Sequence, residues 1–133
     1  MKNYYKVIGL ILILLSGMLF LSCEENKEDV SITYAVKGLS SDFNVTFLNE
    51  DEETIRIDSV LTDDWNYSFI GNKGDIVYIY VRYHEDASLS SNFYVGIEVN
   101  GKAYKYSNSF DKDWGTAGGK YRYQIIRSGT VPF

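Results

Sequence analysis

Cysteine, histidine and proline each occur only once in the 133 residues, as Cys23, His84 and Pro132. A single cysteine cannot form an internal disulfide, so no covalent link within the chain supports its fold. A single histidine leaves His84 as the one imidazole available for acid–base chemistry. The scarcity of proline favours strands, because proline has no N–H group to donate to a sheet.

Basic residues are also few. Thirteen Lys and Arg stand against eighteen Asp and Glu, which gives a formal net charge of -5. This balance argues against strong nucleic-acid binding, which needs clustered Lys and Arg to neutralise phosphates. Aromatic residues are abundant at 16%, and 12 of them are Tyr. A chain of this length and composition predicts one domain built of strands.

The N-terminus has no hydrophobic run long enough to cross a membrane as a helix. Val7 to Leu21 is uncharged for fifteen residues, whereas a membrane-spanning helix needs about 20 apolar residues. Lys2 and Lys6 precede the run, and a positive start before a short apolar segment is typical of a secretory signal. We therefore expect residues 1–22 to be a signal peptide that is removed.

The apolar run ends in "LFLSC", which resembles the lipobox of bacterial lipoproteins. Ser22 fits that pattern, while Phe20 and Leu21 replace the usual leucine and small residue. The resemblance implies that Cys23 receives a diacylglycerol-type lipid and becomes the first residue of a membrane-anchored protein. The acidic residues that follow, "EENKED" (24–29), resemble the surface-export signal of Bacteroidota lipoproteins. We expect a lipid-anchored protein of the bacterial cell envelope, in the outer membrane and exposed at the surface; an incidental cysteine or an uncleaved anchor is the alternative.

After this acidic tether (residues 23–29), residues 30–133 have the pattern of one β-domain. Apolar and polar residues alternate, and turn signals arrive every eight to twelve residues. They predict eight short strands, the first at Ser31–Lys37 and the last at residues 120–127. Trp65 and other large inward aromatic residues should fill the core. With no convincing helix, the pattern predicts an all-β fold, an antiparallel immunoglobulin-like β-sandwich of seven to eight strands.

The clearest local signal is Asn100-Gly101 between two alternating runs. This dipeptide favours a two-residue hairpin, because both turn positions need a positive φ. Such a turn predicts three pairs of facing residues: Val99 with Lys102, Ile97 with Tyr104, and Val95 with Tyr106. In this register Tyr104 and Tyr106 face the core.

Four segments in this order resemble the MmpS-type domain: "ITYAVKG", "NVTFLN", "KGDIVYIYV" after Trp65, and "GIEVNGKAYK". The resemblance covers roughly Ser31 to Tyr123. It implies a small immunoglobulin-like β-sandwich held outside the membrane by an N-terminal anchor. Because the mycobacterial members are transport accessory proteins, it also implies an alternative function, a subunit of an envelope transport complex. The family offers no catalytic residues.

No group of residues has the spacing of an active site or of a metal site. Two acidic residues follow His84, but neighbours in a strand point to opposite faces. Asp111–Gly115 ("DKDWG") begins like a calcium loop, yet Gly115 and Arg122 stand where a carboxylate and a bidentate Glu are needed. We expect no enzyme activity, no catalytic residue, no cofactor and no metal.

The remaining candidate for binding is a group of tyrosines. Tyr78 and Tyr80 alternate with aliphatic residues in "IVYIYVRY", and Tyr94 is out of phase with its apolar neighbours, so all three should face outward. If their strands are adjacent, they form a flat aromatic surface suited to a glycan or a protein partner. Alternatively, they stabilise the sheet as cross-strand pairs. The sequence thus predicts a non-enzymatic envelope lipoprotein that binds a protein or a glycan.

Overall fold

The computed structural model describes residues 28–83, 89–109, 112–113 and 123–132. This part of the chain contains strands and no helix, and all strand pairs are antiparallel. One sheet has the strand order β4-β1-β6-β7 and the other β3-β2-β5-β9-β8. The strands are β1 (Asp29–Leu39), β2 (Phe43–Leu48), β3 (Thr54–Val60), β4 (Asp64–Asn72), β5 (Ile76–Tyr83), β6 (Leu89–Val99), β7 (Lys102–Ser107), β8 (Lys112–Asp113) and β9 (Tyr123–Thr130). The predicted β-sandwich is confirmed.

The strand order is immunoglobulin-like with two differences in the described part of the chain: no strand lies in the place of strand D, and another strand takes the place of strand A. In an immunoglobulin sandwich, strands A, B, E and D form one sheet, and C, F and G form the other, extended by C′ in variable domains. The pairs β1–β4, β2–β5, β2–β3 and β5–β9 correspond to B–E, C–F, C–C′ and F–G. The place of strand A beside B is taken by β6, which comes after β5 in the chain and forms a hairpin with β7.

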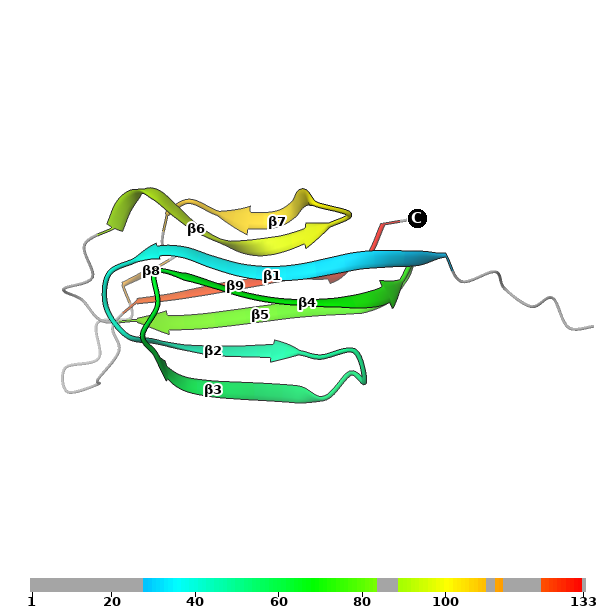
Figure 1. The fold of residues 1–133 in the computed structure, drawn as a ribbon, viewed down its shortest axis with the longest axis horizontal. Helices are drawn as coiled ribbons and strands as arrows, with labels where there is room; N and C mark the ends of the chain where they lie inside the picture. Colours follow the sequence, from blue (N-terminus) through cyan, green and yellow to red (C-terminus); the bar gives the residue numbers. More distant parts are fainter. Residues whose placement is uncertain (1–27, 84–88, 110–111, 114–122, 133) are drawn as a thin grey trace, which may run out of the picture.

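The strands run along the long axis of the molecule, so the described connections gather at its two ends (Figure 1). β1 begins at one end, where the connections β2–β3 and β4–β5 also lie and where the C-terminus is marked. The connections β1–β2 and β3–β4 lie at the opposite end. We call the first the tether end, because β1 begins there, and the second the far end.

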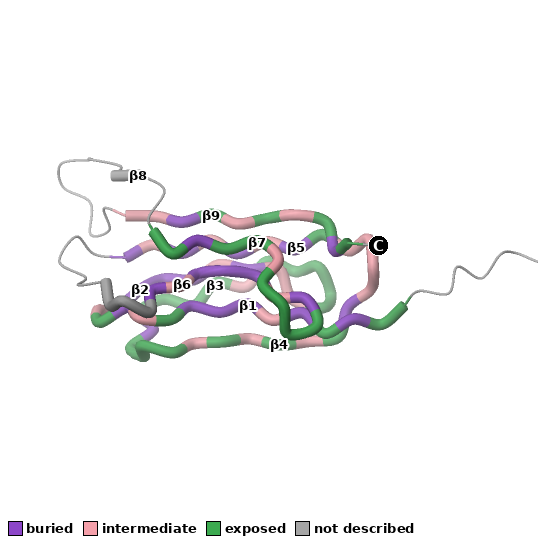
Figure 2. The backbone as a smooth tube through the Cα atoms, turned by 90° about the horizontal axis from the view of Figure 1, so that it is seen from above, coloured by how far each residue is buried: buried purple, intermediate pink, exposed green. Residues whose placement is uncertain are grey.

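The core lies between the two sheets and follows the predicted alternation. Along β5, for example, buried residues alternate with exposed or half-buried ones. The strands β1, β2 and β6 each contain three consecutive buried residues, and Figure 2 shows β6 buried along most of its described length. The largest fully buried side chains include Tyr34, Phe43, Phe47, Ile32 and Ile79. Burial of these apolar surfaces is the main force that holds the two sheets together.

Trp65 does not fill the core as expected. Trp65, Tyr67 and Phe69 share one face of β4, as predicted, but all three are only half-buried. Because β4 is the edge strand of its sheet, its inward side chains pack on one side only. The Phe47 ring lies 5.5 Å from that of Trp65 and 4.6 Å from that of Tyr67. Phe47, rather than Trp65, is the central aromatic residue of this part of the core.

The hairpin turn is confirmed, but the predicted register beyond it is wrong. Asn100 and Gly101 have φ angles of 51° and 71°. The pair of Val99 with Lys102 also forms, after which a β-bulge shifts the pairing. Beyond the bulge the facing pairs are Ile97 with Lys105, Gly96 with Tyr106, and Val95 with Ser107.

The bulge changes the environment of both hairpin tyrosines. Tyr104 is the extra residue, because Ala103 faces Glu98 while Lys105 faces Ile97. An extra residue reverses the direction of every side chain that follows it. Tyr104 is half-buried against the core, whereas Tyr106 points outward and is 54% exposed. The expectation that Tyr106 faces the core is therefore wrong.

Candidate functional site

The three predicted surface tyrosines do not come together. Tyr78 and Tyr80 lie on β5, in the five-stranded sheet, and Tyr94 lies on β6, in the four-stranded sheet. Each is out of phase with the buried residues of its strand, so each belongs to the outer face of its own sheet. The two outer faces point in opposite directions, and the predicted single aromatic surface does not form.

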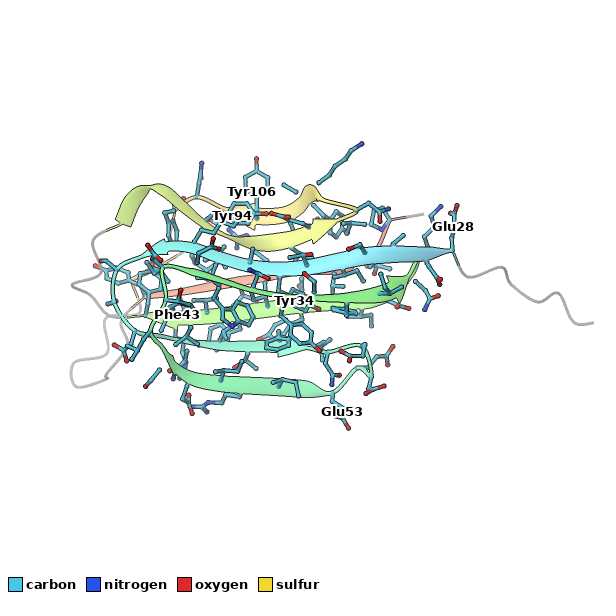
Figure 3. All side chains as sticks on the ribbon, in the orientation of Figure 1. Glu28, Tyr34, Phe43, Glu53, Tyr94 and Tyr106 are labelled. Atoms are coloured by element: carbon cyan, nitrogen blue, oxygen red, sulfur yellow. The ribbon has the colours of Figure 1, made fainter. Side chains whose placement is uncertain are left out.

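Tyr94 instead stacks on a tyrosine that the sequence analysis placed in the core. The rings of Tyr94 and Tyr106 have centroids 5.7 Å apart and planes inclined by 17°. Figure 3 shows both side chains on the outer side of β6 and β7. The Lys37 ammonium lies 5.8 Å from the centre of the Tyr94 ring, within the range of a cation–π interaction. We call Lys37, Tyr94, Glu98 and Tyr106 the tyrosine face.

Gly96 makes this stack possible. It pairs with Tyr106 across the hairpin and lies two residues after Tyr94, on the same face of β6. A Cβ atom at Gly96 would come within 2.6 Å of the Tyr106 Cβ and 2.8 Å of the Tyr94 hydroxyl oxygen. Both distances are too short for non-bonded atoms, so any side chain here would displace one of the two rings.

The Tyr94 hydroxyl stays protonated over a wide pH range. Burial raises the pKa of Tyr94 to about 12, and the negative charge of Glu98 contributes in the same direction. The hydroxyl is buried beside the Glu98 carboxylate but makes no well-formed hydrogen bond within the described residues. The ring is therefore a neutral surface between a cation and a carboxylate.

Tyr78 and Tyr80, on the outer face of the five-stranded sheet, pack against or hydrogen-bond to neighbouring residues. The Tyr80 hydroxyl donates a hydrogen bond to Gln124 Oε1 at 2.8 Å, and the Arg82 guanidinium carbon lies 5.6 Å from the Tyr80 ring centre. Tyr78 is half-buried, and burial raises the pKa of its hydroxyl. These contacts fit the alternative of cross-strand stabilisation better than a free platform.

Sequence reasoning missed two members of the tyrosine face, Lys37 and Tyr106. Both were assigned to strands, but the Tyr106 side chain was predicted to face the core, and no role was predicted for Lys37. The usable signal was Gly96, because an isolated glycine inside a strand pattern often marks a bulge or a close approach. The contact between Lys37 and Tyr94 also depends on the pairing of β1 with β6, which no local pattern reveals.

The acidic loop Asn49–Glu53 is organised by its own hydrogen bonds. The Asn49 side-chain oxygen accepts hydrogen bonds from the backbone N–H groups of Asp51 and Glu53 at 3.1 and 2.8 Å. The Tyr67 hydroxyl donates a short hydrogen bond to Glu50, which lowers the pKa of that carboxyl. No group of three or more His, Cys, Asp or Glu residues in the described ranges is arranged to hold a metal ion.

Several predicted features lie outside the described residues. These are the lipid-attachment residue Cys23 with its signal peptide, His84, and most of Asp111–Gly115. Within the described part, no helix is both long and apolar enough to cross a membrane. No protein-family model matches the chain, and no curated protein has a significantly similar sequence. The resemblances to lipoproteins and to the MmpS-type domain therefore stay predictions.

Proposed function

We propose that the protein is a non-enzymatic binding module of the bacterial cell envelope, anchored by lipid on Cys23, whose tyrosine face contacts a glycan. The observation that carries the binding role is the stack of Tyr94 and Tyr106, with Tyr106 54% exposed. An exposed aromatic ring held in a fixed orientation presents a flat surface to the C–H groups of a sugar at little entropic cost.

The surroundings of the stack favour a glycan over a protein. Apart from the exposed Ile70 of β4, the cross-strand neighbours on this face are small or polar: Thr33 faces Ser68 on one side and Glu98 on the other. The hydroxyls of Thr33 and Ser68 lie 2.8 Å apart and hydrogen-bond to each other. Protein interfaces have an apolar centre with few charges, whereas this face combines one aromatic platform with hydroxyls, a carboxylate and an ammonium. Such groups suit a polyhydroxylated ligand.

The tether end supports the anchoring role. The Gly74 N–H donates to the Val131 carbonyl at 3.0 Å, and the Val131 N–H donates to the Asp75 carbonyl at 2.8 Å. The Lys73 ammonium also pairs with Glu28. The first and last described segments are thus fixed to one turn. Cys23 and Asp29 are six residue steps apart and can be separated by at most about 22 Å, which would hold the domain close to the bilayer.

The test is retention of the full chain, purified in detergent, on an array of bacterial and host glycans. We expect Tyr106→Ala to weaken retention of the best glycan by about three- to tenfold, because it removes one stacking platform. Ile126→Ala removes an exposed apolar side chain from the other sheet and should leave retention unchanged. Retention that is equal in wild type and Tyr106→Ala, or absent for every glycan, contradicts the proposal.

A further inference from the structure

The edge of the four-stranded sheet that β4 forms is open to a further strand. Among the described strands β4 pairs with β1 alone, and Figure 2 shows it as the outermost strand on its side of the molecule. The Lys73 N–H donates to the Glu28 carbonyl and the Gly38 N–H to the Asp63 carbonyl, which extends the pairing of β1 with β4 at both ends. Bonded pairs in an antiparallel ladder recur at every second residue. The odd-numbered residues of β4 therefore bond to β1, and the even-numbered residues direct their N–H and C=O groups outward.

The outward backbone groups at the two ends of β4 are bonded within the chain. The Thr62 hydroxyl donates to the Asp64 carbonyl at 3.2 Å and accepts from the Asp64 N–H at 3.3 Å. At the other end, the Asn72 N–H donates to Asp75 Oδ2 at 2.7 Å, and the Asn72 carbonyl accepts from the Asp75 N–H at 3.2 Å. The outward groups between these ends have no hydrogen-bond partner among the described residues, and they belong to Asn66, Ser68 and Ile70.

The other sheet edges have features that discourage strand pairing. β3 has a register shift, a positive φ at Ser59 and the exposed ion pair of Arg56 with Asp58. β7 has a bulge and two lysines, and β8 is two residues long. β4 has none of these features, because it pairs with β1 over nine consecutive residues without a shift and contains no Lys, Arg or Pro. It is therefore the described edge best suited to a further strand.

The inward side of β4 would be stabilised by such a strand. Trp65, Tyr67 and Phe69 are half-buried, because a strand lies on one side of them only. A strand on the other side would cover their remaining apolar surface and add cross-strand aromatic pairs. It would occupy the place of strand D in an immunoglobulin sandwich, which no described strand fills.

We infer that this place is taken by β4 of a second copy of the chain, paired antiparallel about a two-fold axis between the two Ser68 residues. This register uses all three open residues, because Ser68 faces Ser68 of the second copy and Asn66 faces Ile70 in both directions. It gives three facing pairs with two backbone hydrogen bonds each. On the inward side, Tyr67 of each copy faces Phe69 of the other.

The charges on β4 favour a second copy as the occupant. β4 has no charged side chain after Asp64, and in this register Asp64 faces Asn72 of the second copy. Two chains that each carry a net charge of -5 thus pair along an edge at which no like charges face each other. β4 also has the alternation that the open edge requires, with aromatic side chains inward and Asn66 and Ser68 outward.

The axis is perpendicular to the joined sheet, so the tyrosine faces of both copies lie on the same side of it. The two tether ends point in opposite directions, so two anchors in one membrane would hold the strands along its surface. The pairing itself depends on neither the lipid on Cys23 nor glycan binding. It therefore stands or falls separately from the function proposed above.

The first test follows the full chain in a large excess of detergent micelles, by sedimentation and by hydrogen exchange of individual amides. We expect a reversible dimer at about 100 µM. In the dilute monomer the amides of the odd-numbered residues of β4 should be protected, and in the dimer those of Asn66, Ser68 and Ile70 should become protected as well. A chain that is still monomeric at about 1 mM, or a dimer in which these three amides exchange as fast as in the monomer, overturns the inference. Protection of the three amides in the monomer also overturns it, because the chain itself would then cover the edge.

The second test places charges at the axis. Ser68→Lys and Ser68→Glu should each dimerise at least about threefold more weakly than wild type, because like charges then face each other across the two strands. An equimolar mixture of the two variants should dimerise again, as mixed pairs of opposite charge. Equal dimerisation of Ser68→Lys and wild type, or a mixture that dimerises no better than either variant alone, overturns the inference.

Thr33→Lys is the matched control for Ser68→Lys. Thr33 faces Ser68 from the central strand β1, and the two hydroxyls share one hydrogen bond. Thr33→Lys therefore loses the same hydrogen bond and adds the same charge to the same face, but one strand away from the axis. It should dimerise like the wild type, with a melting temperature similar to that of Ser68→Lys. Weakening of the dimer by Thr33→Lys as large as that by Ser68→Lys would contradict a pairing centred on Ser68.

Discussion

At the scale of single residues, the packing of the two tyrosine rings on the outer face of the four-stranded sheet depends on the space that Gly96 leaves. Gly96 leaves room for the Tyr94 hydroxyl and the Tyr106 Cβ, both of which would be within 3 Å of a side chain there. Tyr94 then lies over the strand, where its hydroxyl is buried beside Glu98. One missing Cβ atom therefore sets both the stacking geometry and the ionisation of Tyr94.

Tyrosine ionisation should make the protein less stable at high pH. Burial raises the pKa of Tyr34 and of Tyr94 to about 12, whereas both ionise near 10 in the unfolded chain. Between these values the unfolded form has already released protons that the folded form still holds. The free energy of unfolding should therefore fall as the pH rises from about 10 to about 12.

Tyr94→Phe tests this directly by urea denaturation across that pH range. The free energy of unfolding of the variant should fall less over this range than that of the wild type, because one of the raised tyrosine pKa values has been removed. At pH 7 its stability should be equal or slightly higher, since the lost hydroxyl is buried without a well-formed hydrogen bond. An unchanged dependence on pH above 10 would contradict the burial of this hydroxyl.

At the scale of strands, the bulge between β6 and β7 connects the two sheets. As the extra residue of the bulge, Tyr104 reaches from the edge strand β7 to β9 in the other sheet. Its hydroxyl donates a hydrogen bond to the Thr130 carbonyl at 2.7 Å, and its ring lies against Gly129, where a Cβ atom would approach the hydroxyl to 2.7 Å. The bulge thus closes one open side of the sandwich.

We expect Tyr104→Phe to lower the free energy of unfolding by about 1 kcal/mol, the usual net worth of one hydrogen bond. Tyr106→Phe is the matched control, because it removes the hydroxyl of an exposed ring from the same strand and should have little effect. Both are measured by urea denaturation at pH 7. If the free energy of unfolding falls equally in the two variants, the hydrogen bond from Tyr104 to Thr130 does not stabilise the contact between the sheets.

Local sequence patterns predicted the strands but not their arrangement. Alternation correctly identified the inward side of β2 and β5, and Asn100-Gly101 correctly identified the hairpin turn. Alternation cannot assign a strand to a sheet, however, because both sheets of a sandwich have an inward face. The condition for a surface shared by Tyr78 and Tyr94, that their strands be adjacent, could therefore not be judged from the sequence, and it is not met because β5 and β6 lie in different sheets. The predicted orientation of the Tyr106 side chain was wrong because the bulge adds one residue to β7. The apolar and polar residues around it still alternate, so the sequence gives no sign of the added residue.

At the scale of the whole molecule, negative charge gathers at the tether end. Figure 3 places Glu28 and Glu53 at this end, and the loop Asn49–Glu53 adds three further acidic residues. Removal of residues 1–22 would leave eleven basic and eighteen acidic residues, a net charge of -7. An acidic surface is repelled by anionic lipid headgroups, so electrostatics alone would not hold the domain on a membrane. Buried acyl chains, at about 0.8 kcal/mol for each CH₂ group, would provide the attachment.

The intact mass of the protein, extracted from membranes of its native host, tests the anchored state most directly. We predict a species that begins at Cys23 and carries the added mass of diacylglycerol-type acyl chains. A chain that still begins at Met1 and carries no acyl mass would contradict the lipid anchor.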